Sequence, residues 1–444
     1  MTDLSARLRA APLDPDTVAT LGASGLKARV VDVTSRPETD AWLQAVARGF
    51  LDGERNDVQR EAFFGPAASR RKIGVYDADT PEPHTPVAPF ASWATELTVP
   101  GGRVPAAAIS AVTVAPTHRR RGILRALMAG ELRTALAEGM PVAALTVSES
   151  TIYGRFGFAP AVASTSWTIN ARRAGWVGPL APGRIDFLSR EQALGLAPAL
   201  HERMRVELPG EVEIPSGHWE RLFGTRVDSE KADSLRAVQY RSASGSVDGI
   251  ALYRASENEA DYSASAVDLL LVLPVTDEAY AGLWRFLLSM DLIATVRASE
   301  LSTDEPLWWM IADQRAATIT VRDHHYLRVL DVAEALQARR FAVADRAVLH
   351  VTDALGIASG DYLLETDAGG AGRVTRLTAG ADDAAGGAAG AAHVHLGVAE
   401  LSAILLGGVS PVTLARAGRL RADDPPRLAR LFASAVTPRL SFWY

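Results

Sequence analysis

The sequence predicts a mixed α/β (α+β) fold organised as three consecutive blocks. A β-branched strand, a basic turn and an apolar-faced helix follow one another over residues 109–139. A strand followed by a helix recurs over residues 262–289, without the basic turn. Short strands and helices then surround a stretch of small residues at 368–392. With 444 residues, the chain has room for two to three domains of about 150 residues each.

The composition is that of an ordinary globular protein and excludes several classes of function. Hydrophobic residues make up 48% and charged residues 22% of the chain, which allows large cores. The absence of cysteine excludes disulfides, thiolate catalysis and zinc fingers. A net charge of −6 and a pI near 5.9 argue against a nucleic-acid scaffold. The first residues lack an apolar signal core, and no apolar run approaches the ~18 residues of a membrane span. We therefore expect a cytoplasmic protein without membrane contact.

The first block is predicted to cover residues 1–170. Residues 1–26 mix proline, glycine and polar residues, so we expect them to form a loosely ordered extension. The segment 38–51 is predicted to be an amphipathic helix, because its apolar residues recur at helical spacing. The other expected elements are strands at 28–33, 73–76, 91–99, 109–114 and 141–147, a helix from 122 to 139, and a glycine-punctuated turn or short helix at 148–158.

The turn at 115–121 carries three consecutive arginines, and Gly122 follows at the start of the helix. Backbone N–H groups at a helix start lack intrahelical partners, and the helix dipole favours an anion there. A glycine lets a ligand approach the backbone closely, and guanidinium groups bind phosphate through forked donors. The turn could therefore bind a pyrophosphate. The alternative is a solvated Arg-rich loop that caps an ordinary helix, and the turn taken alone favours this alternative.

Two motifs together resemble a known family. Residues 119–124 (RRRGIL) resemble the acyl-CoA-binding motif of the GNAT superfamily of N-acetyltransferases, Arg/Gln-x-x-Gly-x-Gly/Ala, although Leu124 replaces the small last residue. Residues 153–158 (YGRFGF) extend the likeness. The two motifs resemble the Eis (enhanced intracellular survival) acetyltransferases of actinobacteria, whose motif also carries a bulky residue at the position of Leu124.

The resemblance covers the chain from about residue 28 and is weakest at 53–90 and 365–400. It implies two GNAT-like acyltransferase folds in tandem, followed by a sterol-carrier-protein-like domain. The second GNAT-like domain is expected at 171–325 and the third domain at 326–444. No basic glycine turn follows any strand of 171–325, so we expect that domain to bind no coenzyme. The elements expected in these domains are strands at 237–240, 249–253, 262–272, 325–330, 341–352 and 360–364, helices at 190–206, 218–222, 279–289, 331–340, 398–406, 412–417 and 423–434, and a flexible low-complexity loop in the second half of 368–392.

The resemblance implies that acetyl-CoA is the cosubstrate and that no metal takes part. Backbone groups of residues 112–114 would bind the pantetheine arm as an added strand does, and the Val114 N–H would polarise the thioester carbonyl. Ser148 and Glu149 match a further coenzyme contact, or else form a plain strand-end turn. The predicted coenzyme-binding residues are Val112, Thr113, Val114, Arg120, Arg121, Gly122, Ile123, Leu124, Arg125, Ser148 and Glu149.

Tyr153 matches the general acid of the family. A phenol has a reference pKa of about 10, so it stays protonated at neutral pH and can give its proton to a thiolate. The alternative is an aromatic core residue beside Phe156 and Phe158. Asp52 matches an acidic residue of the substrate pocket, although an Asp at the end of a helix has an equally good structural explanation.

The chain ends in LSFWY at 440–444, and these aromatic residues would be costly to leave in water. They could anchor the third domain or a subunit contact. The resemblance implies instead that the terminal carboxylate of Tyr444 enters the active site and acts as general base. A terminal carboxylate has a reference pKa of about 3.5, so it would act through a water or after partial desolvation.

The sequence therefore predicts an acetyl-CoA-dependent N-acetyltransferase for amines of polycationic small molecules such as aminoglycosides, with lysine side chains as a further acceptor. The rival hypothesis is a non-catalytic protein that binds an apolar ligand and carries a vestigial acetyltransferase domain. Nucleic-acid binding through the arginines is disfavoured by the acidic pI. His393 and His395 lack a third metal ligand in the sequence. The resemblance also implies a homohexamer, which no sequence signal shows.

Overall fold

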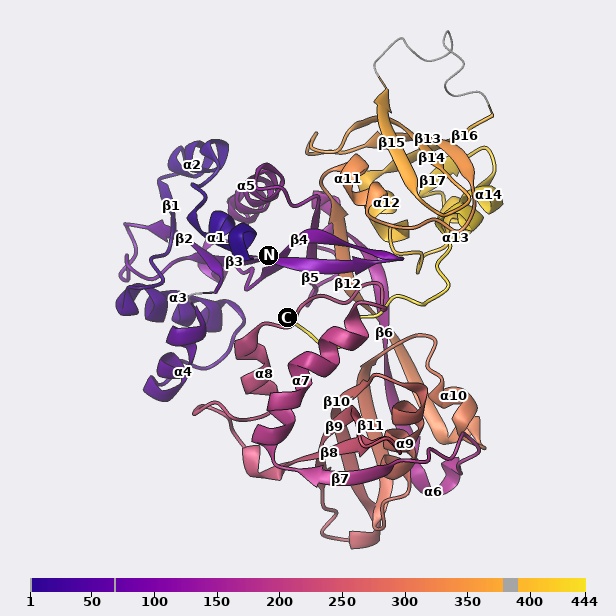
Figure 1. Ribbon diagram of the computed structural model, residues 1–444. Helices are drawn as coiled ribbons and strands as arrows, with labels where there is room; N and C mark the ends of the chain where they lie inside the picture. Colours follow the sequence, from indigo (N-terminus) through magenta and orange to yellow (C-terminus); the bar gives the residue numbers. More distant parts are fainter. Residues whose placement is uncertain (1, 68, 378–389) are drawn as a thin grey trace. The chain divides into compact units, whose positions relative to one another are not determined.

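The computed structural model describes residues 2–67, 69–377 and 390–444. The chain forms two compact units, each assembled from separate stretches of sequence (Figure 1). The first unit contains Met1–Val162, His324–Val436 and Tyr444. The second contains Ala163–Asp323 and Thr437–Trp443. Because the last residue belongs to the first unit and the seven-residue segment before it to the second, the C-terminal segment connects the two units covalently.

The larger sheet of the first unit has the strand order β1-β2-β3-β4-β5-β12. Neighbouring strands are antiparallel except β4 and β5, which are parallel because helix α5 connects them. Strands β2, β3, β4 and β5 are mostly buried, as the apolar runs in their sequences predict. The strands are β1 (Leu26–Val30), β2 (Arg71–Asp77), β3 (Ala88–Val99), β4 (Gly102–Ser110), β5 (Val142–Thr146) and β12 (Ala317–Val329), of which the part from His324 onward belongs to this unit.

The N-terminal segment is helical, so the expectation of a loosely ordered extension over 1–26 is wrong. The buried guanidinium of Arg71 donates to the carbonyls of Leu8 at 3.2 Å and Pro12 at 3.1 Å. Asp14 caps the second helix and forms an ion pair with Arg133 at 2.6 Å. Long-range contacts therefore order this segment. The helices of this part are α1 (Thr2–Ala10), α2 (Pro15–Gly22), α3 (Arg36–Gly49), α4 (Asp57–Ala67) and α5 (Ile123–Ala137).

Strand β4 ends earlier than the sequence predicts. The β-branched run favours a strand over 109–114, but β4 stops at Ser110. Ala111 has φ 54°, a left-handed conformation that a β-strand does not contain. The pairing of β4 with β5 ends at almost the same point, at Ile109 and Leu145. The loss of this tertiary pairing therefore outweighs the local strand propensity of residues 111–114.

In the second unit the strands lie in the order β6-β11-β10-β9-β8-β7. Strands β10 and β11 are parallel and are connected by helix α9, as β4 and β5 are connected by α5. The core contains Trp284 of α9, which is fully buried. The elements are β6 (Ala159–Asn170), β7 (Arg184–Leu188), β8 (Leu235–Arg241), β9 (Val247–Ser256), β10 (Ser265–Pro274), β11 (Ile293–Leu301), α6 (Ala171–Ala174), α7 (Arg190–Arg205), α8 (Ser216–Leu222), α9 (Asp277–Leu288) and α10 (Leu307–Met310).

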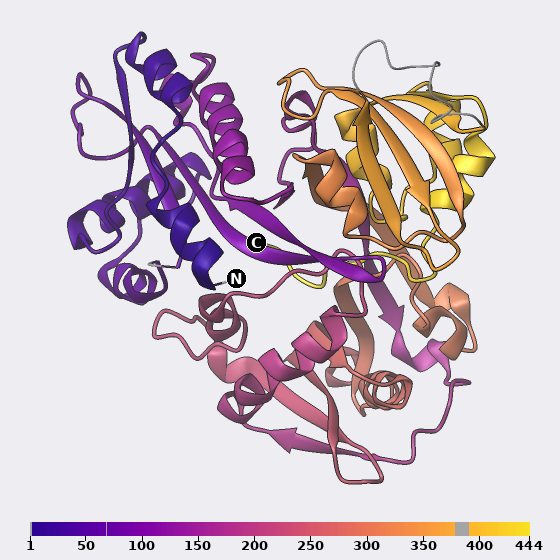
Figure 2. The same cartoon turned by 45° about the horizontal axis from the view of Figure 1, so that its top comes forward.

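The C-terminal part of the first unit contains a five-stranded sheet with the order β15-β14-β13-β16-β17. In Figure 2 its strands, orange to yellow, lie as one twisted layer with the helices beside them. The predicted low-complexity loop lies largely at 378–389, outside the described residues. The elements are β13 (Asp345–Thr352), β14 (Gly360–Thr366), β15 (Gly372–Leu377), β16 (Ala392–Gly397), β17 (Leu420–Ala422), α11 (Val332–Gln337), α12 (Val398–Ile404), α13 (Pro411–Arg416) and α14 (Pro425–Phe432). Over the described ranges, no helix combines the length and apolar character needed to cross a bilayer.

Candidate functional site

The segment after β4 presents an open backbone edge. Thr113 N–H donates to the Pro89 carbonyl at 3.4 Å, and Ala115 N–H donates to the Val87 carbonyl at 2.8 Å. The N–H groups of Val112 and Val114, which alternate with these, donate to no described residue. Alternation along an extended backbone directs them away from β3, toward the side where β5 has stopped pairing. An extended ligand that carries amide groups can bind such an edge as an additional strand.

The basic turn ends in a helix start whose backbone donors are free. Gly122 caps α5 with φ 77°, and no side chain caps the helix. Arg120 also has positive φ, at 65°. The backbone N–H groups of residues 119–125 donate to no described residue. The first intrahelical hydrogen bond runs from the Ala126 N–H to the Gly122 carbonyl at 3.1 Å. Successive unpaired N–H groups with alternating backbone handedness form a concave donor surface for an anion.

The arginines of the turn have different surroundings. Arg121 lies 3.4 Å from the Asp77 carboxylate, which also contacts His118 at 3.0 Å. Hydrogen bonds from the Asp79 backbone and from His118 hold the pKa of Asp77 below its usual range, so this carboxylate is ionised. Arg120 and Arg125 are exposed and form no ion pair with the described acids. Arg121 therefore anchors the turn, while Arg120 and Arg125, like Arg119, are exposed cations available to a ligand.

Reversing the charge of Arg120 or Arg125 is expected to raise the coenzyme Kd about tenfold each, because each removes a phosphate partner and adds repulsion. Isothermal titration calorimetry with acetyl-CoA measures this. Arg373→Glu, an exposed substitution on β15, controls for the change in net charge and should leave the Kd within twofold. Equal affinity in all three variants would place the phosphates elsewhere.

Ser148 and Glu149 follow β5 in an exposed turn. The Glu149 carbonyl accepts a hydrogen bond from Ile152 N–H at 3.3 Å, which leads the chain toward Tyr153. This geometry suits a strand-end turn, and their contact with a coenzyme stays a prediction.

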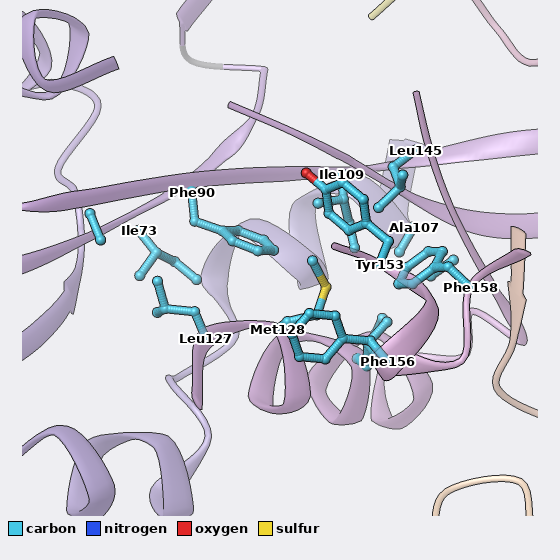
Figure 3. Close-up of a cluster of buried hydrophobic side chains, with 14 of the residues drawn as sticks. Ile73, Phe90, Ala107, Ile109, Leu127, Met128, Leu145, Tyr153, Phe156 and Phe158 are labelled. Carbon is cyan, nitrogen blue, oxygen red and sulfur yellow. The ribbon is translucent and has the colours of Figure 1, made fainter. Parts of the chain in front are cut away.

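Tyr153 lies in the apolar core of the first unit, and its side chain packs edge-on against Phe158 with ring centres 6.2 Å apart. Figure 3 shows its hydroxyl directed away from Phe156 and Phe158. This hydroxyl forms no hydrogen bond with a described residue. Its oxygen is not fully buried, so a ligand can reach it. Burial, and then the charge of Glu149, raises the pKa of Tyr153 to about 12. Both interpretations of Tyr153 are therefore compatible with the structure: its ring is part of the core, and its protonated hydroxyl is available as a donor.

The C-terminal residue lies at the end of β5. The Thr146 hydroxyl donates to a carboxylate oxygen of Tyr444 at 2.5 Å. The phenol of Tyr444 lies 2.7 Å from His325 Nε2, and its ring packs edge-on against Trp93 at 5.2 Å. Burial raises the pKa of this phenol well above its usual value, so the phenol stays protonated beside His325. The terminal carboxylate is thus bound by Thr146, at the end of β5 where β4 and β5 stop pairing.

Asp52 occupies a surface turn after α3. Leu51, just before it, has φ 62°, and the Asp52 carboxylate forms an ion pair with Arg55 at 2.5 Å. A Cβ on Gly49, at the end of α3, would lie 2.2 Å from the Thr113 side chain. The helix end therefore contacts the open edge, while the carboxylate of Asp52 is half exposed and already paired.

Two cations beside buried tryptophans were missed by sequence analysis. The Arg70 guanidinium stacks over Trp93 at 4.2 Å, and the Lys72 ammonium lies 5.7 Å from the ring of Trp42. Burial, and then the charge of Arg70, lowers the pKa of Lys72 to about 7. The only signal was a basic run, residues 70–72, at the start of a buried strand.

The second unit offers a different helix start at the corresponding position. Helix α9 is capped by the Thr276 side chain, which accepts from Ala279 N–H at 3.1 Å, and its first turn carries Asp277 and Glu278. Acidic residues there complement the helix dipole and repel phosphate. We therefore expect one acetyl-CoA per chain in a calorimetric titration, and a stoichiometry of two would contradict this.

Among the described residues, no three His, Cys, Asp or Glu side chains are placed to bind a metal. His393 and His395 lie on the exposed face of β16, and the ring of His395 stacks on His350 at 4.3 Å. Burial, followed by the neighbouring His350, lowers the pKa of His395.

Comparison with protein families matches three domains. Two models described as acetyltransferase (GNAT) domains match residues 31–161 and 210–329, and a sterol carrier protein domain matches 332–441. The predicted fold class, tandem GNAT folds followed by a sterol-carrier-protein-like domain, is confirmed.

Relatives match over most of their length. An uncharacterized N-acetyltransferase of Streptomyces avermitilis is 37% identical over 408 residues, covering 88% of this chain and 93% of the relative. The N-acetyltransferase Eis of Mycobacterium tuberculosis is 34% identical over 359 residues, covering 78% and 83%. The solved structure of Eis1 from Mycobacterium abscessus superposes with a TM-score of 0.78 at 28% identity, covering 94% of this chain and all of that one.

Proposed function

Because the chain belongs to the Eis-like GNAT N-acetyltransferases, we propose that it transfers the acetyl group of acetyl-CoA to a primary amine of a small molecule. The observation that carries this proposal is the juxtaposition, in one strand–turn–helix unit, of an open backbone edge at Val112 and Val114 with unpaired N–H groups at the start of α5. The edge would bind the pantetheine arm. The helix start, with Arg120 and Arg125, would bind the pyrophosphate.

The chain supplies three groups to the transfer. The Val114 N–H would stabilise the negative charge that develops on the carbonyl oxygen as the amine nitrogen bonds to the acetyl carbon and the carbon–sulfur bond breaks. The Tyr153 hydroxyl would give its proton to the departing thiolate. The Tyr444 carboxylate would accept the proton that the amine loses, through a water. The raised pKa of Tyr153 supports the acid role, because the phenol stays protonated at every physiological pH.

The charges around the terminal carboxylate do not by themselves select a polycation. Asp52, the predicted acidic contact, is paired with Arg55, and Arg70 is the cation stacked on Trp93. An aminoglycoside would bring several further positive charges to this region. Polyamines, aminoglycosides, lysine peptides and simple monoamines are therefore equal candidates as acceptors. The hexamer implied by the resemblance likewise stays a prediction, which light scattering can test.

An acetyl-CoA-dependent thiol-release assay across these four amine classes tests the proposal. We expect turnover with at least one class, and mass spectrometry of the product should show a gain of one acetyl group on nitrogen. Acetyl-CoA hydrolysis without any amine product, or no turnover in any class, would contradict the proposed acceptor chemistry.

A further inference from the structure

The second unit repeats, at β10 and β11, the divergence that the first unit has at β4 and β5. The parallel pairing runs from Ser265 opposite Ile293 to Leu269 opposite Ala298 and ends there. At the same level both strands shift register against their other neighbours, and Glu300 adopts φ 57°. Interrupted pairing on both strands leaves a hollow between them.

The C-terminal end of the chain lines this hollow. Its walls are residues 269–272 of β10 and 299–301 of β11, and Arg439 and Ser441 complete the lining. Both belong to the segment Thr437–Trp443, which we call the tail segment and which packs within the second unit. In the second unit, the chain's own tail segment thus lies where β10 and β11 diverge. The corresponding place in the first unit, where β4 and β5 diverge, is the proposed binding site of the pantetheine arm.

Glu211 is the buried anchor of the tail segment. Its side chain is fully buried, and its carboxylate lies 3.4 Å from Arg439 Nε and 3.1 Å from the Ser441 hydroxyl, which donates to it. Burial alone would raise the pKa of Glu211, but His201, 3.7 Å away, and Arg439 outweigh it and hold the pKa below its usual range. A buried carboxylate that is ionised requires its cationic partner, so the tail segment completes this charge pair.

Further contacts fix the tail segment on both sides of this pair. The Arg439 backbone N–H donates to the Pro209 carbonyl at 2.8 Å, and the Thr437 hydroxyl donates to Asp304 at 3.4 Å. The buried ring of Phe442 packs edge-on against His218 at 5.1 Å. The tail segment is therefore held by charge, backbone and aromatic contacts within the second unit.

We infer that the second GNAT fold serves as a clamp for the tail segment, and that Glu211 is a positioning residue for the terminal carboxylate of Tyr444. The inference rests on the proposed role of that carboxylate as general base. Holding the segment that directly precedes Tyr444 removes much of the freedom of a C-terminus to fray, so fewer positions are open to the base. The second fold thereby has a function in catalysis without binding coenzyme.

The test compares Glu211→Gln with Glu305→Gln in the full-length protein. Glu305 is a matched control, because it is also a buried carboxylate of the second unit but accepts its hydrogen bonds from Tyr280 and Ser302. The rate at which carboxypeptidase Y releases Tyr444 reports the freedom of the tail. The value of kcat with the best amine and the Kd of acetyl-CoA report function.

Glu211→Gln is expected to speed Tyr444 release at least tenfold and to lower kcat at least tenfold, with the Kd of acetyl-CoA within twofold of wild type. Glu305→Gln should leave all three values within twofold. Ser441→Ala, which removes one hydroxyl donor but keeps the cationic partner of Glu211, should shift release and kcat in the same direction by a smaller factor. It keeps the test valid if Glu211→Gln does not fold.

The outcomes separate the two proposals. Faster release with an unchanged kcat would leave the clamp standing and would show that the terminal carboxylate is not the base. An unchanged release rate in folded Glu211→Gln or, where that variant does not fold, in Ser441→Ala would overturn the clamp, whatever happens to kcat.

Discussion

Adding one glycine after Tyr444 is expected to lower kcat by at least about 10²-fold while the Kd of acetyl-CoA stays within twofold. General acid–base catalysis contributes about 10² to 10⁴ in rate. In the wild-type protein a carboxylate oxygen of Tyr444 lies 2.5 Å from Thr146 Oγ1. The added glycine moves the negative charge away from this position by one residue, about 3.5 Å. Deleting Tyr444 should have the same effect, because the carboxylate is then displaced in the opposite direction.

Tyr444→Phe is the matched variant, since it keeps the terminal carboxylate and loses only the phenol. The phenol bonds His325 at 2.7 Å, so its loss removes one hydrogen bond worth about 1 kcal/mol. We expect kcat within about fivefold of wild type. Steady-state kinetics on the three variants decides the matter, and normal turnover in the extended protein would rule out the carboxylate as base.

Tyr153→Phe is the second variant with a large expected effect, a fall in kcat of about 10²-fold or more. Phenylalanine preserves the edge-on contact with Phe158 and removes only the hydroxyl. The departing thiolate then lacks a donor. The KM for acetyl-CoA should change little, since the phenol is proposed to act only as the carbon–sulfur bond breaks.

Tyr76→Phe provides the control for this substitution. Tyr76 is also buried, and burial raises its pKa to about 12, but its ring stacks under Arg29. It should therefore retain kcat within twofold. A Tyr153→Phe enzyme with normal kcat would assign Tyr153 to the core alone, which is the alternative that the sequence left open.

In the first unit, features that depend on sequence neighbours were predicted correctly, and features that depend on distant residues were not. The strand–turn–helix order around Gly122 is predictable because it depends on neighbours in the sequence: a left-handed residue and the free donors of a helix start. The predicted strand over 109–114 fails because the end of β4 depends on where β5 stops pairing, and β5 begins some thirty residues later. The N-terminal helices were missed because Arg71, a residue outside the segment, supplies the donors that order it.

The candidate site divides in the same way. From local spacing and residue type, the sequence by itself predicted the strand, basic turn and helix around Gly122 and the absence of such a turn in the second unit. The resemblance of its motifs to a known family predicted the fold class. Only the tertiary structure decided that Arg121 is neutralised by Asp77, that Asp52 is paired with Arg55, and that Thr146 contacts a carboxylate 298 residues away. Such pairs depend on how distant segments pack, and side-chain charge and hydrogen bonding are satisfied only after that packing exists.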